Sequence, residues 1–166
     1  MTSALVHTAI MTGFILLETV LYPLGLMRGA APDVALVILC FSANHHGSSR
    51  GELAGFATGI VEDALSLAPL GFHAIIRATI GFLYGLTRSN LFIDPVLMPV
   101  VIVAVATLMK AVLAFLFAAI FAREIAATVF SAPFGLELLM NALVAPFVYG
   151  LLQMFGMISG KATSRL

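Results

Sequence analysis

Long apolar stretches alternate with short polar or glycine- and proline-containing segments along the whole chain. Mainly apolar runs cover about residues 4–21, 51–67, 72–87, 96–121 and 134–158. Most of these runs approach or exceed the roughly 20 residues that a helix needs to cross the hydrocarbon core of a membrane. The pattern therefore predicts an all-α membrane protein with a transmembrane helix in each of these segments.

A further helix is expected between the first two runs, but its extent is ambiguous. Its clean apolar part, Val34–Ala43, is too short to span a membrane. A spanning helix would have to begin near Leu24 and cross Arg28, Gly29 and Pro32. We therefore expect a kinked or partly re-entrant helix here, followed by a polar loop over residues 44–50.

The composition supports one membrane domain over residues 1–166. Apolar residues make up 61% of the chain and charged residues only 10%, against about 25% charged residues in an ordinary soluble domain. About six spans fit into this length, so we expect a compact bundle of about six transmembrane helices. The N-terminal segment has no Lys or Arg, which favours a retained helix over a cleaved signal peptide. Zero net charge without runs of like charge argues against nucleic-acid binding.

The distribution of basic residues predicts the orientation of the bundle. With six spans and a cytoplasmic N-terminus, one side of the membrane holds Arg50, Arg88, Lys161 and Arg165, and the other holds Arg28 and Arg123. Cytoplasmic loops of membrane proteins carry an excess of Lys and Arg. We therefore expect both termini, and the segment at residues 44–50, in the cytoplasm.

Two neighbouring helices carry small and polar residues at four-residue spacing. The first series is Gly51, Gly55, Gly59 and Asp63, and the second is His73, Arg77, Gly81 and Gly85. Small residues at this spacing allow helix backbones to approach closely in lipid. A tight turn at residues 69–71 joins the two helices, so we expect antiparallel neighbours packed through these two series.

The same two helices contain charges that need partners inside a membrane. Arg77 and Asp63 lie at similar distances from the turn, so they reach a similar depth. A charge in lipid is costly and normally finds a partner within the bundle. We expect either Asp63 or Glu62 to pair with Arg77. Because adjacent residues diverge by about 100° on a helix, we expect one of the two acids to face a different helix.

Polar residues in the other helices extend this picture. Glu18 and Glu137 lie near the predicted outer ends of the first and last helices, and Lys110 lies near the middle of the fifth. Asn141 is interpreted as an interhelical hydrogen-bonding residue. Such a set could form a proton or ion path or a substrate cavity. We favour a structural polar network that fixes helix register, because the acids lie on different helices.

The sequence offers little support for catalysis or metal binding. It lacks the H-E-x-x-H spacing of zinc peptidases, a G-x-S-x-G elbow and a phosphate-binding loop. His45 and His46 are adjacent in the expected polar loop, without a spaced carboxylate partner, and are interpreted as solvated residues. The single cysteine, Cys40, lies in an apolar stretch and is expected to pack. We therefore expect a protein that is not an enzyme and that uses no metal or cofactor.

The chain resembles the rod shape-determining protein MreD family in several segments. These are Pro32–Asp33, then the run Arg50–Asp63 with its basic-Gly entry and Gly-Phe-x-x-Gly core, then Pro69–His73, and finally Asn141–Pro146 in the last helix. The chain departs from the family pattern at Glu62, where a second acid precedes the expected Asp63. The length and the six-helix layout also agree with this family.

The resemblance implies a non-enzymatic scaffold of the bacterial cell-elongation complex in the inner membrane. The expected partners are a single-pass MreC-like protein and the peptidoglycan synthases of lateral wall growth. The family fold is similar to that of the substrate-binding subunits of energy-coupling-factor transporters, so a vitamin-capture subunit is the alternative function. Such a subunit needs an Ala-x-x-x-Ala face on its first helix and aromatic ligand contacts. The first helix here has only Ala4 and Ala9, and the chain has no Trp, which favours the scaffold.

Overall fold

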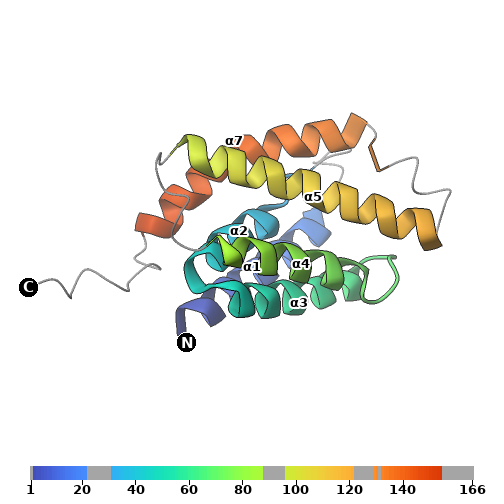
Figure 1. Ribbon diagram of the computed structural model, residues 1–166, viewed down its shortest axis with the longest axis horizontal. Coiled ribbons are helices and arrows are strands. Elements are labelled where there is room, and N and C mark those ends of the chain that lie inside the picture. The colour runs from blue at the N-terminus through green and yellow to red at the C-terminus, as the bar shows by residue number, and fades with distance from the viewer. Residues whose placement is uncertain (1, 22–30, 88–95, 122–128, 131, 155–166) are drawn as a thin grey trace, which may run out of the picture.

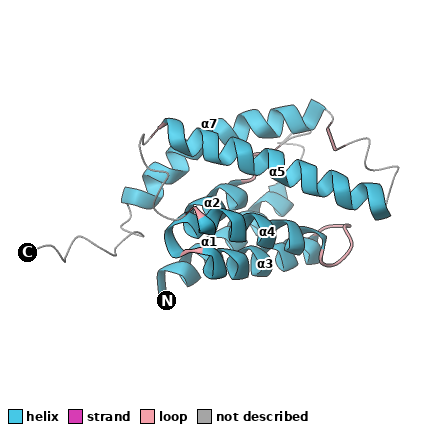
Figure 2. Ribbon diagram, viewed as in Figure 1, coloured by secondary structure: helices cyan, strands magenta, loops and turns pink. Residues whose placement is uncertain are grey.

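The computed structural model describes residues 2–21, 31–87, 96–121, 129–130 and 132–154, and in these residues helices are the one kind of regular secondary structure (Figure 1). Six helices lie in these ranges: α1 (Thr2–Leu21), α2 (Val34–His46), α3 (Ser48–Leu65), α4 (Phe72–Leu86), α5 (Leu97–Phe121) and α7 (Ala132–Met154). Only short loops and turns join them within the described residues (Figure 2). The expected all-α architecture of six helices is therefore present.

Helix α2 is the central helix of the bundle. It contacts α1, α3, α4, α5 and α7, and every residue from Ala35 to Asn44 is buried. Helices α5 and α7 pack together along one side of the bundle, and α3 and α4 pack together on the other side (Figure 1). At 1.5 Å per residue, the 13 residues of α2 are only about 20 Å long. The most enclosed helix is thus also the shortest.

The outer helices present apolar side chains to their surroundings. Leu5 on α1, Leu53 on α3, Phe82 on α4, Leu116 on α5 and Phe147 on α7 are all exposed. Helix α5 and residues Pro133–Met154 of α7 are long and apolar enough to cross a membrane, while α1, α2 and α4 contain shorter apolar helices. An apolar outer surface around a core that contains charges suits a lipid environment.

The start of α2 differs from the expected kinked helix. Ala31, Pro32 and Asp33 are not helical, and the Asp33 carboxylate accepts a hydrogen bond of 2.8 Å from the Leu36 backbone N–H. A side-chain acceptor in this position caps the first turn of a helix. The helix therefore begins at Val34, and the part of the expected kinked helix from about residue 24 to residue 30 lies outside the described residues.

The prediction of a polar loop at residues 44–50 is wrong. Asn44, His45 and His46 belong to α2, and α3 begins at Ser48. Gly47 alone separates the two helices, and its φ of +92° is in the region that favours glycine. The amide of Asn44 is buried and donates to the Thr87 carbonyl at 3.2 Å and to the Thr87 hydroxyl at 3.1 Å. Polarity in this segment reflects contacts between helices, not a solvated loop.

Candidate functional site

The close approach of α3 and α4 is the feature that positions the charged residues. A Cβ added at Gly55 would overlap the Arg77 backbone, and one added at Gly59 would overlap the Ala74 backbone. Gly51 and Gly81 would likewise overlap each other's backbone, and Gly85 lies against Ser48. As residue numbers rise along α3 from Gly51 to Gly59, the numbers of the contacting residues in α4 fall, so the two helices are antiparallel. We call this contact the glycine seam. It consists of Gly51, Gly55 and Gly59 of α3 and of Gly81 and Gly85 of α4.

Arg77 is the first node of a buried network of charges. Its side chain is only 4% exposed. Its Nε donates to Glu62 Oε2, and its Nη2 lies 3.0 and 3.2 Å from the two carboxylate oxygens of Asp33. One guanidinium therefore joins α4 to α3 and to the start of α2. A planar guanidinium can serve two carboxylates because its donors point in fixed, separate directions.

Lys110 is the second cation of the network. Its Nζ lies 2.7 Å from Asp33 Oδ2 and 2.8 Å from Glu137 Oε1. Asp33 is thus shared by a cation from α4 and a cation from α5, and Glu137 adds α7 to the same network. A buried carboxylate between two cations is stabilised in its charged form by both of them.

Asn141 ties the network to the backbone of the central helix. Its Oδ1 accepts a hydrogen bond of 2.7 Å from the Asp33 backbone N–H, and its Nδ2 donates to Thr107 Oγ1 at 3.0 Å. The side chain is completely buried. The structure thus gives Asn141 both a donor and an acceptor role between three elements. We call the set Asp33, Glu62, Arg77, Lys110, Glu137 and Asn141 the polar network.

Asp63 serves a different purpose from its neighbour Glu62. Its carboxylate accepts the backbone N–H groups of Gly71 at 2.8 Å, His73 at 2.8 Å and Ala74 at 3.2 Å. It also lies 2.8 Å from His73 Nδ1. Asp63 therefore caps the N-terminus of α4, where an acid is favoured by the helix dipole. Of the two acids left open by the sequence, Glu62 makes the ion pair with Arg77.

Asp33 is the residue that the sequence reasoning missed as a member of this site. In the sequence, Asp33 was noted only as part of the Pro32–Asp33 segment that resembles the MreD family. Its position directly before an apolar run is a typical N-cap signal. Its contact with both buried cations had no local signal, because Arg77 and Lys110 are 44 and 77 residues away along the chain.

The charges of the polar network largely neutralise one another. Three carboxylates bind two cations, and Glu18 on α1 is close enough to interact electrostatically with Asp33 and Lys110. No group of three or more potential metal ligands occurs among the described residues. The arrangement is suited to holding five elements in one register, since each cation is already bound to two acids.

Helices with an apolar exterior around a buried network of charges define the class of α-helical membrane proteins. The chain matches the family of the rod shape-determining protein MreD over residues 2–155, and it belongs to that family. Membership implies a role in the determination of rod shape in bacteria. No curated protein and no solved structure matches the chain.

The capping role of Asp63 leads to a first prediction. Asp63→Ala should lower the stability of the purified protein by about 1–2 kcal/mol, because three backbone N–H groups lose their acceptor. Thermal unfolding in detergent measures the effect. Glu52→Ala is the matched control, since Glu52 is an exposed acid on the same helix. Equal effects of the two substitutions would contradict the capping role.

Proposed function

We propose that the chain is a non-enzymatic membrane scaffold of the bacterial cell-elongation complex. In this proposal it binds a single-pass MreC-like protein and thereby supports lateral peptidoglycan synthesis by the synthases of that complex. The family match over residues 2–155 is the observation that carries the proposal. The inner membrane is the location that the proposal requires, with all six helices embedded in lipid and the chain folded as one domain.

The polar network supports a structural use of the bundle interior. Its two cations bind carboxylates from other elements of the same chain. The Asp63 carboxylate already accepts hydrogen bonds from backbone N–H groups at the N-terminus of α4. The outer surface is left mainly apolar. Because lipid is as apolar as leucine, a partner helix must be held by close packing and a few polar bonds. This surface is suited to such packing over a large area.

A groove beside the α3–α4 turn also favours the scaffold over vitamin capture. It has a volume of about 580 Å³ and is lined largely by apolar side chains, among them Leu67, Phe72, Phe117 and Phe121. A vitamin site needs polar groups that fix the orientation of its ligand. This groove offers few such groups, and it is better suited to acyl chains or apolar side chains.

Co-purification tests the proposed function directly. The tagged chain is extracted from its native membranes in a mild detergent, and the proteins that accompany it are identified by mass spectrometry. We expect an MreC-like single-pass protein together with a peptidoglycan synthase. The proposal fails if no wall-synthesis protein accompanies the chain. It also fails if the purified chain alone binds a vitamin tightly in calorimetry.

The proposed topology makes a second prediction. In a Cys40→Ser background, Ser49→Cys and Ser164→Cys should be protected from an impermeant thiol reagent in intact cells, because both sites are assigned to the cytoplasm. Leu67→Cys is the matched control: it lies two residues beyond the C-terminal end of α3 and is fully exposed, so it should be labelled. Labelling of Ser49→Cys with protection of Leu67→Cys would reverse the orientation.

A further inference from the structure

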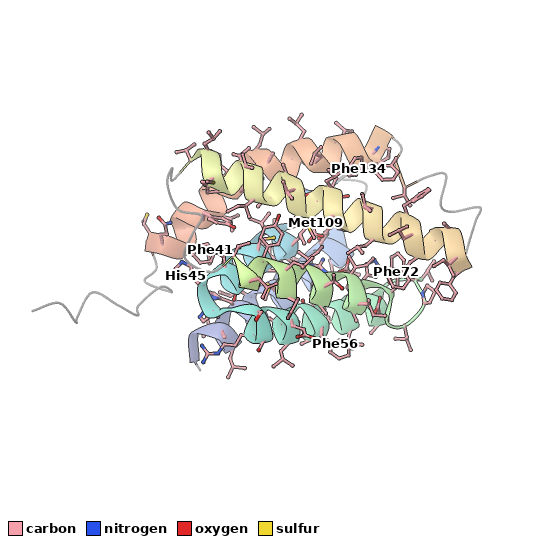
Figure 3. All side chains as sticks on the ribbon, in the orientation of Figure 1. Phe41, His45, Phe56, Phe72, Met109 and Phe134 are labelled. Carbon is pink, nitrogen blue, oxygen red and sulfur yellow. The ribbon has the colours of Figure 1, made fainter. Side chains whose placement is uncertain are left out.

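A second cluster of polar side chains lies at the end of the bundle opposite the polar network. His7 on α1 is completely buried, and its Nδ1 lies 3.2 Å from Ser42 Oγ on α2. The same hydroxyl lies 3.3 Å from Nδ1 of His46, and the two imidazole rings are 5.3 Å apart. Figure 3 shows His45 and Phe41 at this end and Phe72 at the other. None of these three residues belongs to the polar network.

We propose that His7, Ser42 and His46 form a pH-sensitive latch that fastens α1 to the central helix. The latch holds while His7 is neutral and opens when His7 takes up a proton. Its ligand is therefore the proton, and its moving part is α1. The proposal does not depend on the identity of any partner protein.

The first support is the way in which α1 is attached. Among the helices that the structure describes, α1 packs against α2 and α3 only. Its threonines at positions 8, 12 and 19 bond to carbonyls of their own helix. Among the described residues, His7 to Ser42 is the one side-chain hydrogen bond from α1 to another helix. Within the described residues, α1 is thus held by packing, by the electrostatic interactions of Glu18 and by one side-chain hydrogen bond that involves a titratable residue.

The second support is the position of the hydrogens. Nδ1 of His46 lies 2.9 Å from the Ser42 carbonyl, so this nitrogen carries a hydrogen and donates it. The single hydrogen of the Ser42 hydroxyl is then free to be donated to Nδ1 of His7. The same distance also fits a neutral His7 whose Nδ1 donates to the hydroxyl, and in both cases Nε2 of His7 is buried without a hydrogen-bond partner among the described residues.

A second proton on His7 would break this pattern. Both ring nitrogens would then be donors, so the Ser42 hydroxyl could only accept from His7, and the Nε2–H group would be a buried donor without an acceptor among the described residues. The new charge would be fully buried, without a carboxylate to pair with it among the bonds of the described residues. Folding with α1 in place therefore favours neutral His7, and a detached α1 favours the charged form.

The surrounding charges act in the same direction. The titratable groups that act on His7 are His46 and His45, both on α2. Helix α3 also packs against α1, and its charged residues at this end, Arg50 and Glu52, are exposed. The groups that act on His7 include no acid among the described residues, so a charge gained by His7 would not be offset there.

Hydrogen exchange of the full-length protein in detergent tests the latch. Backbone exchange of α1 and α4 is compared at about pH 7.5 and about pH 5.5, on either side of the ordinary histidine pKa of about 6.5. After correction for the intrinsic pH effect, we expect exchange in α1 to rise about tenfold at the lower pH. Exchange in α4 should stay unchanged. Equal acceleration of both helices, or no change in α1, would overturn the proposal.

Variants identify the groups responsible. His7→Gln should exchange rapidly in α1 at both pH values and should lose the pH response. Ser42→Ala should exchange faster in α1 at both pH values but should keep part of the response, because His7 stays buried. His45→Gln is the matched control and should retain the response, since the described bonds of Ser42 go to His7 and His46. A pH response that survives His7→Gln would refute the latch.

A direct observation is available without substitution. The chain has four histidines, so histidine labelled with ¹⁵N gives a spectrum simple enough to assign. At about pH 7.5 we expect His7 in the neutral form. A charged His7 ring in the folded protein at this pH would also exclude the latch, even if the variants do not fold.

Discussion

Arg77→Met is expected to cause one of the largest losses of stability available by a single substitution in this chain. The change removes a cation that binds both Asp33 and Glu62 in the interior of the bundle. Breaking a buried ion pair from one side costs on the order of 3–5 kcal/mol, because the remaining charge is left without its partner. We expect little folded protein in size-exclusion chromatography and a strongly lowered thermal midpoint.

Second substitutions test which acid depends on Arg77. Glu62→Gln combined with Arg77→Met should recover part of the lost stability, since the unpaired charge is removed. Asp63→Asn combined with Arg77→Met should give no recovery, because Asp63 binds the N-terminus of α4. If Asp63→Asn recovers as much as Glu62→Gln, the assignment of the two acids is wrong.

Gly55→Leu is expected to have an effect of similar size through packing alone. A Cβ at this position would overlap the carbonyl group of Arg77 and approach the backbone nitrogen of Ala78. Backbone atoms of a helix cannot move aside as the end of a flexible side chain can. Inserting atoms into a packed interior typically costs about 1–3 kcal/mol, and we expect this variant to exceed that range. Separation of α3 and α4 would also pull Arg77 away from Glu62.

Gly13→Leu is the matched control for this prediction. Gly13 lies within α1, and a Cβ added there meets nothing within 4 Å. Thermal unfolding of both variants should show a large loss for Gly55→Leu and little change for Gly13→Leu. Measuring co-purification beside stability separates a loss of fold from a loss of partner binding. Equal stability of the two variants would show that α3 and α4 are not packed through the glycine seam.

The pairing of α3 and α4 could be predicted because its signal is local. Glycines at four-residue spacing mark one face of a helix, and a short turn fixes the neighbour and its direction. The same reasoning narrowed the partner of Arg77 to Glu62 or Asp63. It could not choose between them, because the choice depends on where the amide groups at the start of α4 point, which only the folded turn determines.

The centre of the polar network could not be predicted for a different reason. Asp33, Lys110 and Glu137 lie on separate elements, and their meeting depends on how α2, α5 and α7 are arranged in space. The polar loop was expected for a related reason: polarity was interpreted as exposure to water. In this bundle Asn44 is polar and buried at once, because it bonds to Thr87 at the end of α4.

The shared position of Asp33 has a consequence for the biogenesis of the protein. Helix α2 is synthesised early. The residues that bind its capping residue Asp33 follow 44, 77 and 108 residues later in the chain: they are Arg77, Lys110 and Asn141. A nascent chain that has released only its first four helices therefore holds Asp33 without Lys110 and Asn141. All these contacts of the central helix can form only when α7 has left the ribosome. A chain that terminates before α7 consequently loses contacts at its second helix as well as at its end.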